Sequence, residues 1–301
     1  VTFRRKGQVQ SVKASREVIL AGGAINSPQL LMLSGVGPGA HLRELGVEVI
    51  HDAPGVGQNL HDHTCAHLVY DVPEQLSVNA STRGLGLVGQ VINYAVNRAG
   101  LLALGTSHTG LFARVMEGVE QPDIQITTRP FSFVFNGGTI GISKTPTATT
   151  SVYQLRPQSR GTITLRSPDI ADAPRMVANY MASSRDQATL VAGLRLAAKI
   201  MQSPLLRDCK LTTPLPDDDA GVVEMLRKTL GPVYHPVGTC RMGRDADAVV
   251  DPRLRVRGIA GLRVADASIM PEIVSSNTNA TVMMIGEKAA DLIREDQRRG
   301  A

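Results

Sequence analysis

The segment REVILAGGAINSPQLLMLSGVG, residues 16–37, constrains the fold of this chain more than any other. It begins with a short apolar run typical of a buried strand, and Gly22 and Gly23 follow. Ser27 is a favourable N-cap, Pro28 suits the first helical position, and a glycine after the leucine stripe provides a C-terminal stop. The pattern therefore predicts a strand, a tight turn and a helix. In α/β sheets such a turn presents backbone groups to a ligand.

Farther along the chain, strands come first and helices follow. Alternating patterns at 123–135, 151–155 and 159–167 indicate strands, and 156–161, which joins the last two, is predicted to be a hairpin loop. Amphipathic patterns with acidic starts at 184–203 and 217–231 indicate helices. Strands followed by helices, without strict alternation, are typical of an α+β domain built on an antiparallel sheet.

Composition excludes several classes of protein. With 43% hydrophobic and 20% charged residues the chain is globular, and its net charge of +5 has no basic run interleaved with aromatics, so we expect no nucleic-acid partner. No apolar run is long enough for an integral membrane segment. Three scattered cysteines suggest reduced thiols and a cytoplasmic location. The chain begins with Val in what reads as the middle of a sheet, so we expect that an N-terminal portion is missing.

Two cysteine- and histidine-containing segments raise the question of a metal or a thiol nucleophile. In HDHTC, His61, Asp62 and His63 are too close in sequence to converge on one ion, and no second cluster exists, so we predict no metal site. Nothing in the sequence near Cys240 would activate its thiol. His235 precedes a proline that bends the backbone, which leaves open a buried structural histidine or one aimed at a ligand.

A polar loop precedes the predicted C-terminal helix. A strand at 262–265 ends in Asp266, and SSNTNAT then leads into a helix at Thr281, whose first turn has free N–H groups for an anion or a developing negative charge. Helix capping accounts for one asparagine, but not for both Asn277 and Asn279. No G-x-G-x-x-G fingerprint occurs, so the two glycines of the first turn are either part of a nucleotide site or helix punctuation.

Six segments together resemble the glucose–methanol–choline (GMC) flavoprotein oxidoreductases, in that family's order. They are GAINSPQLLMLSGVG, PGVGQNLHDH, SRGTITLRS, YHPVGTCRMG, VVDPRLRVRGIAGLRVADASIMP and NTNATVMMIGEKAADLI. The resemblance covers nearly the whole chain and is weakest across residues 70–150. It implies FAD as the cofactor, with His235 as the catalytic base and Asn277 at the partner position, where the family has His or Asn. It also implies cofactor contacts at Gly22, Gly23, Asp266, Ala267, Asn279, Ala280 and Thr281.

The resemblance implies a fold that combines α/β and α+β parts. An incomplete Rossmann-like FAD-binding domain would comprise residues 1–63 and, with the catalytic residues, 231–301. The inserted substrate-binding domain would comprise residues 64–230, on an antiparallel sheet flanked by helices.

The implied reaction is oxidation of a primary alcohol to an aldehyde, with hydride transfer to flavin N5 and a neutral imidazole, of ordinary pKa about 6.5, accepting the hydroxyl proton. The implied enzyme resembles choline dehydrogenase, although the alcohol and the electron acceptor stay unspecified. A choline-type substrate would need an aromatic cage, and Phe131, Phe133 and Phe135 read more readily as sheet core. The alternatives are a flavin-containing hydroxynitrile-type lyase of the same family and a non-catalytic fragment unable to hold FAD.

Overall fold

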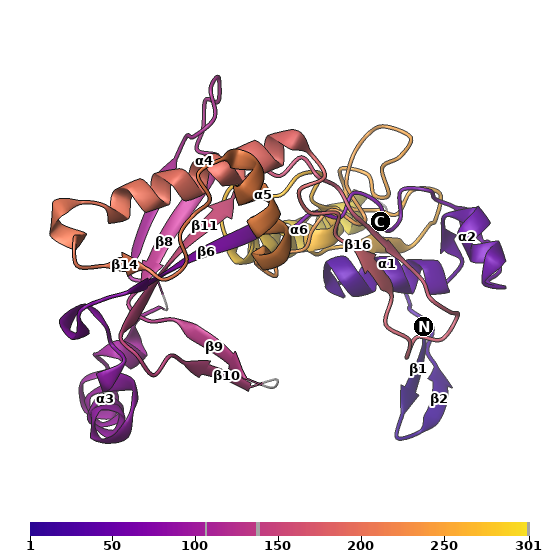
Figure 1. The fold of residues 1–301 in the computed structure, drawn as a ribbon. Helices are drawn as coiled ribbons and strands as arrows, with labels where there is room; N and C mark the ends of the chain where they lie inside the picture. Colours follow the sequence, from indigo (N-terminus) through magenta and orange to yellow (C-terminus); the bar gives the residue numbers. More distant parts are fainter. Residues whose placement is uncertain (106, 137–138, 300–301) are drawn as a thin grey trace. The chain divides into compact units, whose positions relative to one another are not determined.

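The structure is a computed structural model that describes residues 1–105, 107–136 and 139–299. The chain forms two compact units (Figure 1). Unit 1 comprises Val1–Asp62, Ser159–Tyr180 and Tyr234–Ala301, and unit 2 comprises His63–Gln158 and Met181–Val233. Each unit has its own hydrophobic core. The mixed α/β class with an antiparallel sheet and helices is confirmed.

Unit 1 contains a parallel strand pair, which is the strand arrangement expected of a Rossmann-like domain. Its elements are β1 (Thr2–Arg5), β2 (Gln8–Ser11), β3 (Val18–Leu20), α1 (Gly23–Leu33), β4 (Val36–Gly37), α2 (Gly39–Glu44), β5 (His51–Asp52), β12 (Thr162–Thr164), β13 (Arg175–Val177), β16 (Leu262–Val264), the 3-10 turn η5 (Ala267–Ile269) and α6 (Asn279–Arg299). β3 pairs with β16 in parallel, and β1 pairs with β2 as an antiparallel hairpin. α1 packs against η5, the turn that follows β16.

The helix predicted from Pro28 starts earlier in the structure. α1 begins at Gly23, so Ser27 is not its N-cap and Pro28 lies inside the helix. A proline inside a helix cannot donate to the carbonyl four residues back, which here belongs to Ala24. The Thr239 hydroxyl donates to that Ala24 oxygen at 2.6 Å and replaces the lost bond. The predicted stop at Gly35 is confirmed, with φ of 79° just beyond the C-cap.

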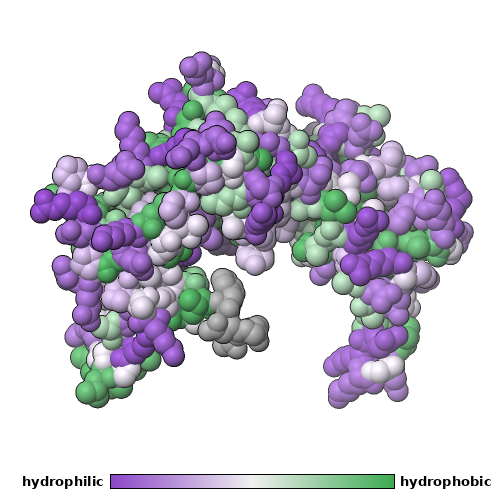
Figure 2. Space-filling model, in the orientation of Figure 1, coloured by the Kyte–Doolittle hydropathy of each residue, from purple (hydrophilic) through white to green (hydrophobic). Residues whose placement is uncertain are grey.

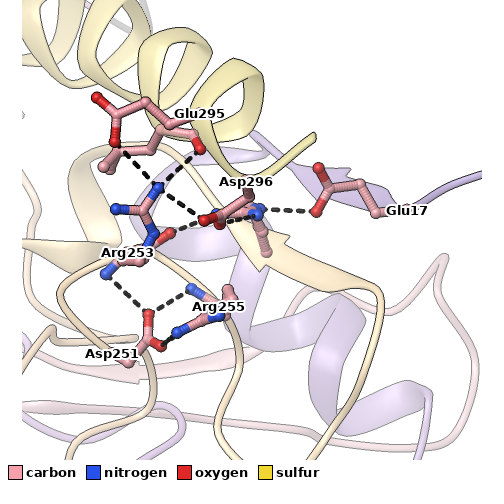
Figure 3. A network of polar contacts seen from close by, with 8 residues as sticks. Glu17, Asp251, Arg253, Arg255, Glu295 and Asp296 are labelled. Carbon is pink, nitrogen blue, oxygen red and sulfur yellow. Dashed lines mark hydrogen bonds and ion pairs between the residues drawn. The ribbon is translucent and has the colours of Figure 1, made fainter. Parts of the chain in front are cut away.

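An ionic network fastens the C-terminal helix of unit 1 to the parallel strand pair (Figure 3). Arg263 in β16 is 4% exposed and bonds both Glu17, just before β3, and Asp296 of α6, each at 2.7 Å. Arg253 reaches Asp296 at 2.7 Å from a loop. These arginines lower the pKa of Asp296 to about 2. α6 is therefore held by paired charges as well as by its buried apolar residues.

Unit 2 is a six-stranded antiparallel sheet covered on one face by helices. Its elements are β6 (Thr64–Asp71), η1 (Glu74–Leu76), η2 (Ala80–Thr82), α3 (Gly84–Asn97), η3 (Leu101–Ala103), β7 (Thr109–Ala113), β8 (Ile124–Arg129), β9 (Phe133–Asn136), β10 (Thr139–Ile142), β11 (Thr147–Gln154), α4 (Ser184–Met201), η4 (Pro204–Leu206), β14 (Lys210–Leu211), α5 (Asp219–Thr229) and β15 (Gly231–Pro232). The strand order is β14-β6-β11-β8-β7, with β15 also paired to β6. α4 and α5 match the two predicted helices.

α4 supplies most of the cover over this sheet. Its residues Leu190 and Leu194 are fully buried against Ile124 of β8 and Val152 of β11. The side of the helix bearing Gly193 lies close to the sheet, since an added Cβ at Gly193 would lie 2.8 Å from the Val152 side chain. Apolar residues at helical spacing thus meet apolar residues at strand spacing, which is why α4 lies along this face.

The hairpin predicted at 156–161 is wrong. β11 pairs with β6 and β8, whereas β12 pairs with β13, so the two strands are not partners. The segment 159–180 also groups with unit 1, in contrast to the predicted inserted domain of 64–230. The cause is long-range pairing: Gly161 exchanges two backbone hydrogen bonds with Leu60, and Ile163 donates to Gly57.

Candidate active site

His235 lies in a backbone bulge. On one side of it the Val233 N–H donates to the His63 carbonyl at 3.0 Å, and on the other Val237 and His61 exchange two hydrogen bonds at 2.9 and 3.2 Å. Residues 234–236 therefore stand opposite a single residue of the partner segment. Bulges of this kind redirect a side chain and are common beside active sites.

Asp62 is the single residue opposite the bulge, and its carboxylate replaces the missing backbone acceptor. Its Oδ1 accepts the backbone N–H of His235 at 2.8 Å, and its Oδ2 accepts the Tyr180 hydroxyl at 3.2 Å. Tyr234 has a φ of 62°, which turns the chain just before the histidine. The bent backbone expected around Pro236 is therefore present, fixed by a buried carboxylate.

The His235 imidazole is half-buried and tuned by two opposing effects. Burial lowers its pKa below the usual value, and the Asp62 carboxylate partly offsets this by raising it. The net effect lowers the pKa, so the neutral form predominates at neutral pH. Burial, followed by the charge of Asp62, raises the pKa of Tyr180, which keeps that phenol a hydrogen-bond donor.

Asn277 lies beside the reactive edge of this imidazole. Its Nδ2 is 3.4 Å from His235 Nε2, a long hydrogen-bond contact in which the amide donates to an unprotonated Nε2. In the tautomer that this contact implies, the Nε2 lone pair faces the amide. The two residues predicted from SSNTNAT and YHPVGT, some 40 positions apart, are thus brought together.

The first turn of α6 follows Asn277 and offers backbone donors. The first helical bond at this end runs from the Val282 N–H to the Thr278 carbonyl at 2.9 Å, and within the described chain the N–H groups of 279–281 have no backbone acceptor. Asn279 and Ala280 are exposed, and Thr281 is half-buried. A ligand with electronegative oxygen atoms, such as the pyrimidine end of FAD, fits these donors and the positive end of the helix.

The start of α1 is occupied by protein groups. Asp266 accepts the Gly23 N–H at 2.9 Å and the Ser27 hydroxyl at 2.5 Å on one oxygen, and the Ser268 N–H at 2.8 Å on the other. The Gly22 N–H donates to the Ser27 hydroxyl. Direct donation from these two glycines to a cofactor would require displacing those bonds.

Close approach to the α1 turn remains sterically open. An added Cβ at Gly23 would have no atom within 4 Å, and Ala267, next to Asp266, is half-buried. The adenosine contact at Gly22 and Gly23, and the contacts at Asp266 and Ala267, stay predictions.

Two of the cysteine thiols, those of Cys65 and Cys240, are buried. Burial raises the pKa of Cys65 to about 12 and that of Cys240 well above its usual value, so both stay protonated. Among the described residues, no group of three or more His, Cys, Asp or Glu side chains could hold a metal ion.

Two of the three phenylalanines considered for an aromatic cage already have partners. Phe131 and Phe133 pack edge to face with ring centroids 5.2 Å apart, and the Arg129 guanidinium lies 5.1 Å from the Phe133 centroid. A cation thus already lies over that ring and would repel a second one. The side chain of Phe135, the third member of the predicted set, lies outside the described ones.

Three site residues were not predicted from the sequence. The sequence suggested Asp62 only as a metal-ligand candidate and Thr239 only as a member of YHPVGTCRMG, and it did not suggest Tyr180. The HD dipeptide before a strand was a usable signal for Asp62, because a carboxylate there can replace a backbone acceptor. Tyr180 gave no signal, since its partner lies 118 positions away.

Family models described as GMC oxidoreductase match residues 1–65 and 157–286 of the chain. An uncharacterized GMC-type oxidoreductase of Mycobacterium tuberculosis is 41% identical over 98% of this chain and 56% of the relative. Choline oxidase of Arthrobacter globiformis is 39% identical over 96% of this chain and 50% of its own length. An alcohol dehydrogenase [acceptor] of Pseudomonas putida is 38% identical over 97% of this chain and 54% of its own length.

Solved structures of two oxidases superpose on nearly the whole chain. Formate oxidase of Aspergillus oryzae, in a structure on FAD modification, superposes with a TM-score of 0.88 at 28% identity, over 97% of this chain and 56% of its own. Pyridoxine 4-oxidase superposes with a TM-score of 0.79 at 26% identity, over 96% of this chain and 53% of its own. The chain therefore spans about half the length of the curated relatives it matches, 50–56% for those named here.

Proposed function

The chain belongs to the GMC oxidoreductase family, and from that premise we propose that it serves FAD-dependent oxidation of a primary alcohol to an aldehyde. FAD is the cofactor. The observation that carries the proposal is the contact between His235 Nε2 and Asn277 Nδ2 at 3.4 Å, next to the first turn of α6, whose N–H groups at 279–281 have no backbone acceptor among the described residues.

His235 acts as the general base. Oxidation of an alcohol requires loss of the hydroxyl proton, and a neutral imidazole with an accessible Nε2 accepts it. The lowered pKa keeps the imidazole neutral at pH 7, and Asp62 fixes the backbone that carries it. Such help is typically worth about 10²–10⁴-fold in rate.

Asn277 holds the substrate oxygen. Its amide cannot ionise, so it donates a hydrogen bond at every working pH. When substrate enters, the amide N–H exchanges His235 Nε2 for the alcohol oxygen as its acceptor. The N–H groups of 279–281 and the helix dipole hold the electronegative end of the cofactor. When bound, FAD supplies the hydride acceptor.

The substrate class is a primary alcohol whose identity stays open. The relatives' names include choline oxidase and an alcohol dehydrogenase, which supports an alcohol in general. We propose choline and simple primary alcohols as the first substrates to test, because both kinds of name occur among the relatives.

The first experiment is an absorption spectrum of the purified chain mixed with FAD, before and after anaerobic addition of primary alcohols. We expect bleaching of the bound flavin by the natural chain. His235→Gln should bind the same flavin and bleach about 10²–10⁴-fold more slowly. His108→Gln, at an exposed histidine of unit 2, is the matched control and should bleach normally.

Three results would contradict the proposal. Normal bleaching by His235→Gln would remove this residue from the mechanism. A flavin that stays oxidised while a cyanohydrin is cleaved would indicate a lyase. Failure of the chain to bind flavin at all would indicate a non-catalytic fragment.

A further inference from the structure

Helix α3 exposes an apolar stripe to solvent. Leu85, Val88, Ile92 and Val96 recur at helical spacing on one side, and all four are exposed, Leu85 to 90%. No residue of α3 is buried. Figure 1 shows the helix set apart from α4 and α5, and Figure 2 shows hydrophobic surface at that place. In a soluble protein such a stripe normally faces the core.

The polar face of α3 is the one that packs against its own unit. The half-buried residues of the helix are Gly86, Gln90 and Asn93, which share one side of the helix, rotated by roughly 120° from the centre of the stripe. Gln90 Oε1 accepts the Leu101 N–H at 3.0 Å, and an added Cβ at Gly86 would lie 2.4 Å from the Ala80 carbonyl. The orientation of the helix is therefore fixed by close polar contacts, and it is inverted relative to a core-facing helix.

The sequence segment that contains α3 carries positive but no negative side chains. No Asp or Glu occurs between Glu74 and Glu117, although the chain has 27 acidic residues, whereas Arg83 and Arg98 flank the helix at its two ends. Arg98 is exposed, and its guanidinium lies 5.4 Å from the centroid of the Tyr94 ring. Arginine and tyrosine with an apolar stem and a polar end are typical of the membrane interface.

We propose that α3 docks the protein on the surface of an anionic lipid bilayer. The apolar stripe enters the boundary between headgroups and acyl chains, and Arg98 lies at the level of the lipid phosphates. The exposed Leu102 and Leu104 just after the helix extend the apolar surface. The helix has 14 residues, too few for a bilayer that needs about 20. No helix in the described part of the chain has the length and apolar composition to cross a membrane.

A segment without acidic side chains, flanked by arginines, favours this occupant over a second copy of the chain. Two copies meeting through α3 would bring Arg83 and Arg98 of one near those of the other, with no acidic side chain in the segment to pair with them. A bilayer containing anionic lipid supplies both the apolar layer and the negative charge.

The test is co-sedimentation of the full chain with phosphatidylcholine vesicles, with and without phosphatidylglycerol, at low and high salt. We expect sedimentation with the anionic vesicles that weakens with salt. Leu85→Gln should lower the partition coefficient by about tenfold, and Arg98→Asn by about fivefold. The matched control is Leu205→Gln in η4, because Leu205 is 92% exposed and lies in the same unit; it should bind as the natural chain does.

The result that supports the proposal is loss of vesicle binding in Leu85→Gln and Arg98→Asn but not in Leu205→Gln. Circular dichroism should show all three variants folded, since the substituted side chains are exposed. Equal sedimentation with uncharged vesicles, or equal loss in the control, would overturn it. So would an oligomer in the absence of lipid that Leu85→Gln dissociates, which would assign α3 to contact between copies.

Discussion

Asp62 acts on His235 through geometry and through charge. Its carboxylate accepts the backbone N–H of the bulge, and its negative charge counteracts the lowering of the imidazole pKa by burial. The two effects can be separated, because an asparagine keeps an oxygen acceptor and removes the charge. Asp62 is thus a positioning residue, and its electrostatic effect on the pKa of His235 can be measured separately.

We expect Asp62→Asn to move the acid limb of the activity profile to lower pH. The active base is neutral, so activity falls as pH drops through the pKa of His235. Removing the carboxylate charge lowers that pKa further, and the loss should begin at lower pH. The measurement is the pH dependence of kcat/KM, with Asp172→Asn, at an exposed aspartate of unit 1, as control. An inflection that stays in place or moves upward would contradict the assignment.

At the scale of elements, punctuation in the sequence predicted α4, α5 and the presence of α1, but not α3, and long-range partners decided where α1 begins. The Gly35 stop and the acidic starts of α4 and α5 are local, and these were predicted. The start of α1 depends on Asp266, 243 positions from Gly23, and no local pattern contains that information. The pair of His235 and Asn277 was predicted because family motifs carry long-range geometry, whereas Tyr180 lies in no such motif.

Asp266 joins the start of α1 to the end of β16, and its loss should destabilise unit 1. Asp266→Ala removes a buried acceptor of three hydrogen bonds and leaves the Gly23 N–H without a partner. We expect a loss of about 3 kcal/mol or more in the free energy of unfolding, measured by denaturant titration. Asp291→Ala, at an exposed carboxylate of α6, should change it by less than about 0.5 kcal/mol. Equal effects would show that the Asp266 bonds contribute little.

For the whole molecule, the division into two units separates the proposed chemistry from the proposed docking surface. His235, Asn277 and all the residues predicted to contact FAD belong to unit 1, whereas α3 belongs to unit 2. The division at 159–180 was not predictable from composition, because that segment is assigned by backbone pairing with Gly57 and Leu60.

FAD should therefore stabilise the two units unequally. At a concentration of 100 times its Kd, a ligand that binds only the folded state adds about 2.7 kcal/mol. We expect hydrogen exchange to slow in the first turn of α6 and around Gly23, and to stay unchanged in α3 and α4. Uniform protection of both units, or slowing confined to unit 2, would contradict the assignment of the cofactor residues.

The bulge at His235 also bears on how such a chain can diversify. Backbone hydrogen bonds to His61 and His63, together with the carboxylate of Asp62, fix the backbone on both sides of His235. None of these bonds involves a side chain of unit 2. Substitutions of side chains elsewhere would leave this stretch of backbone in place. Under the proposed mechanism, substrate preference could change during evolution while the backbone continued to hold His235, the proton acceptor, in the same position.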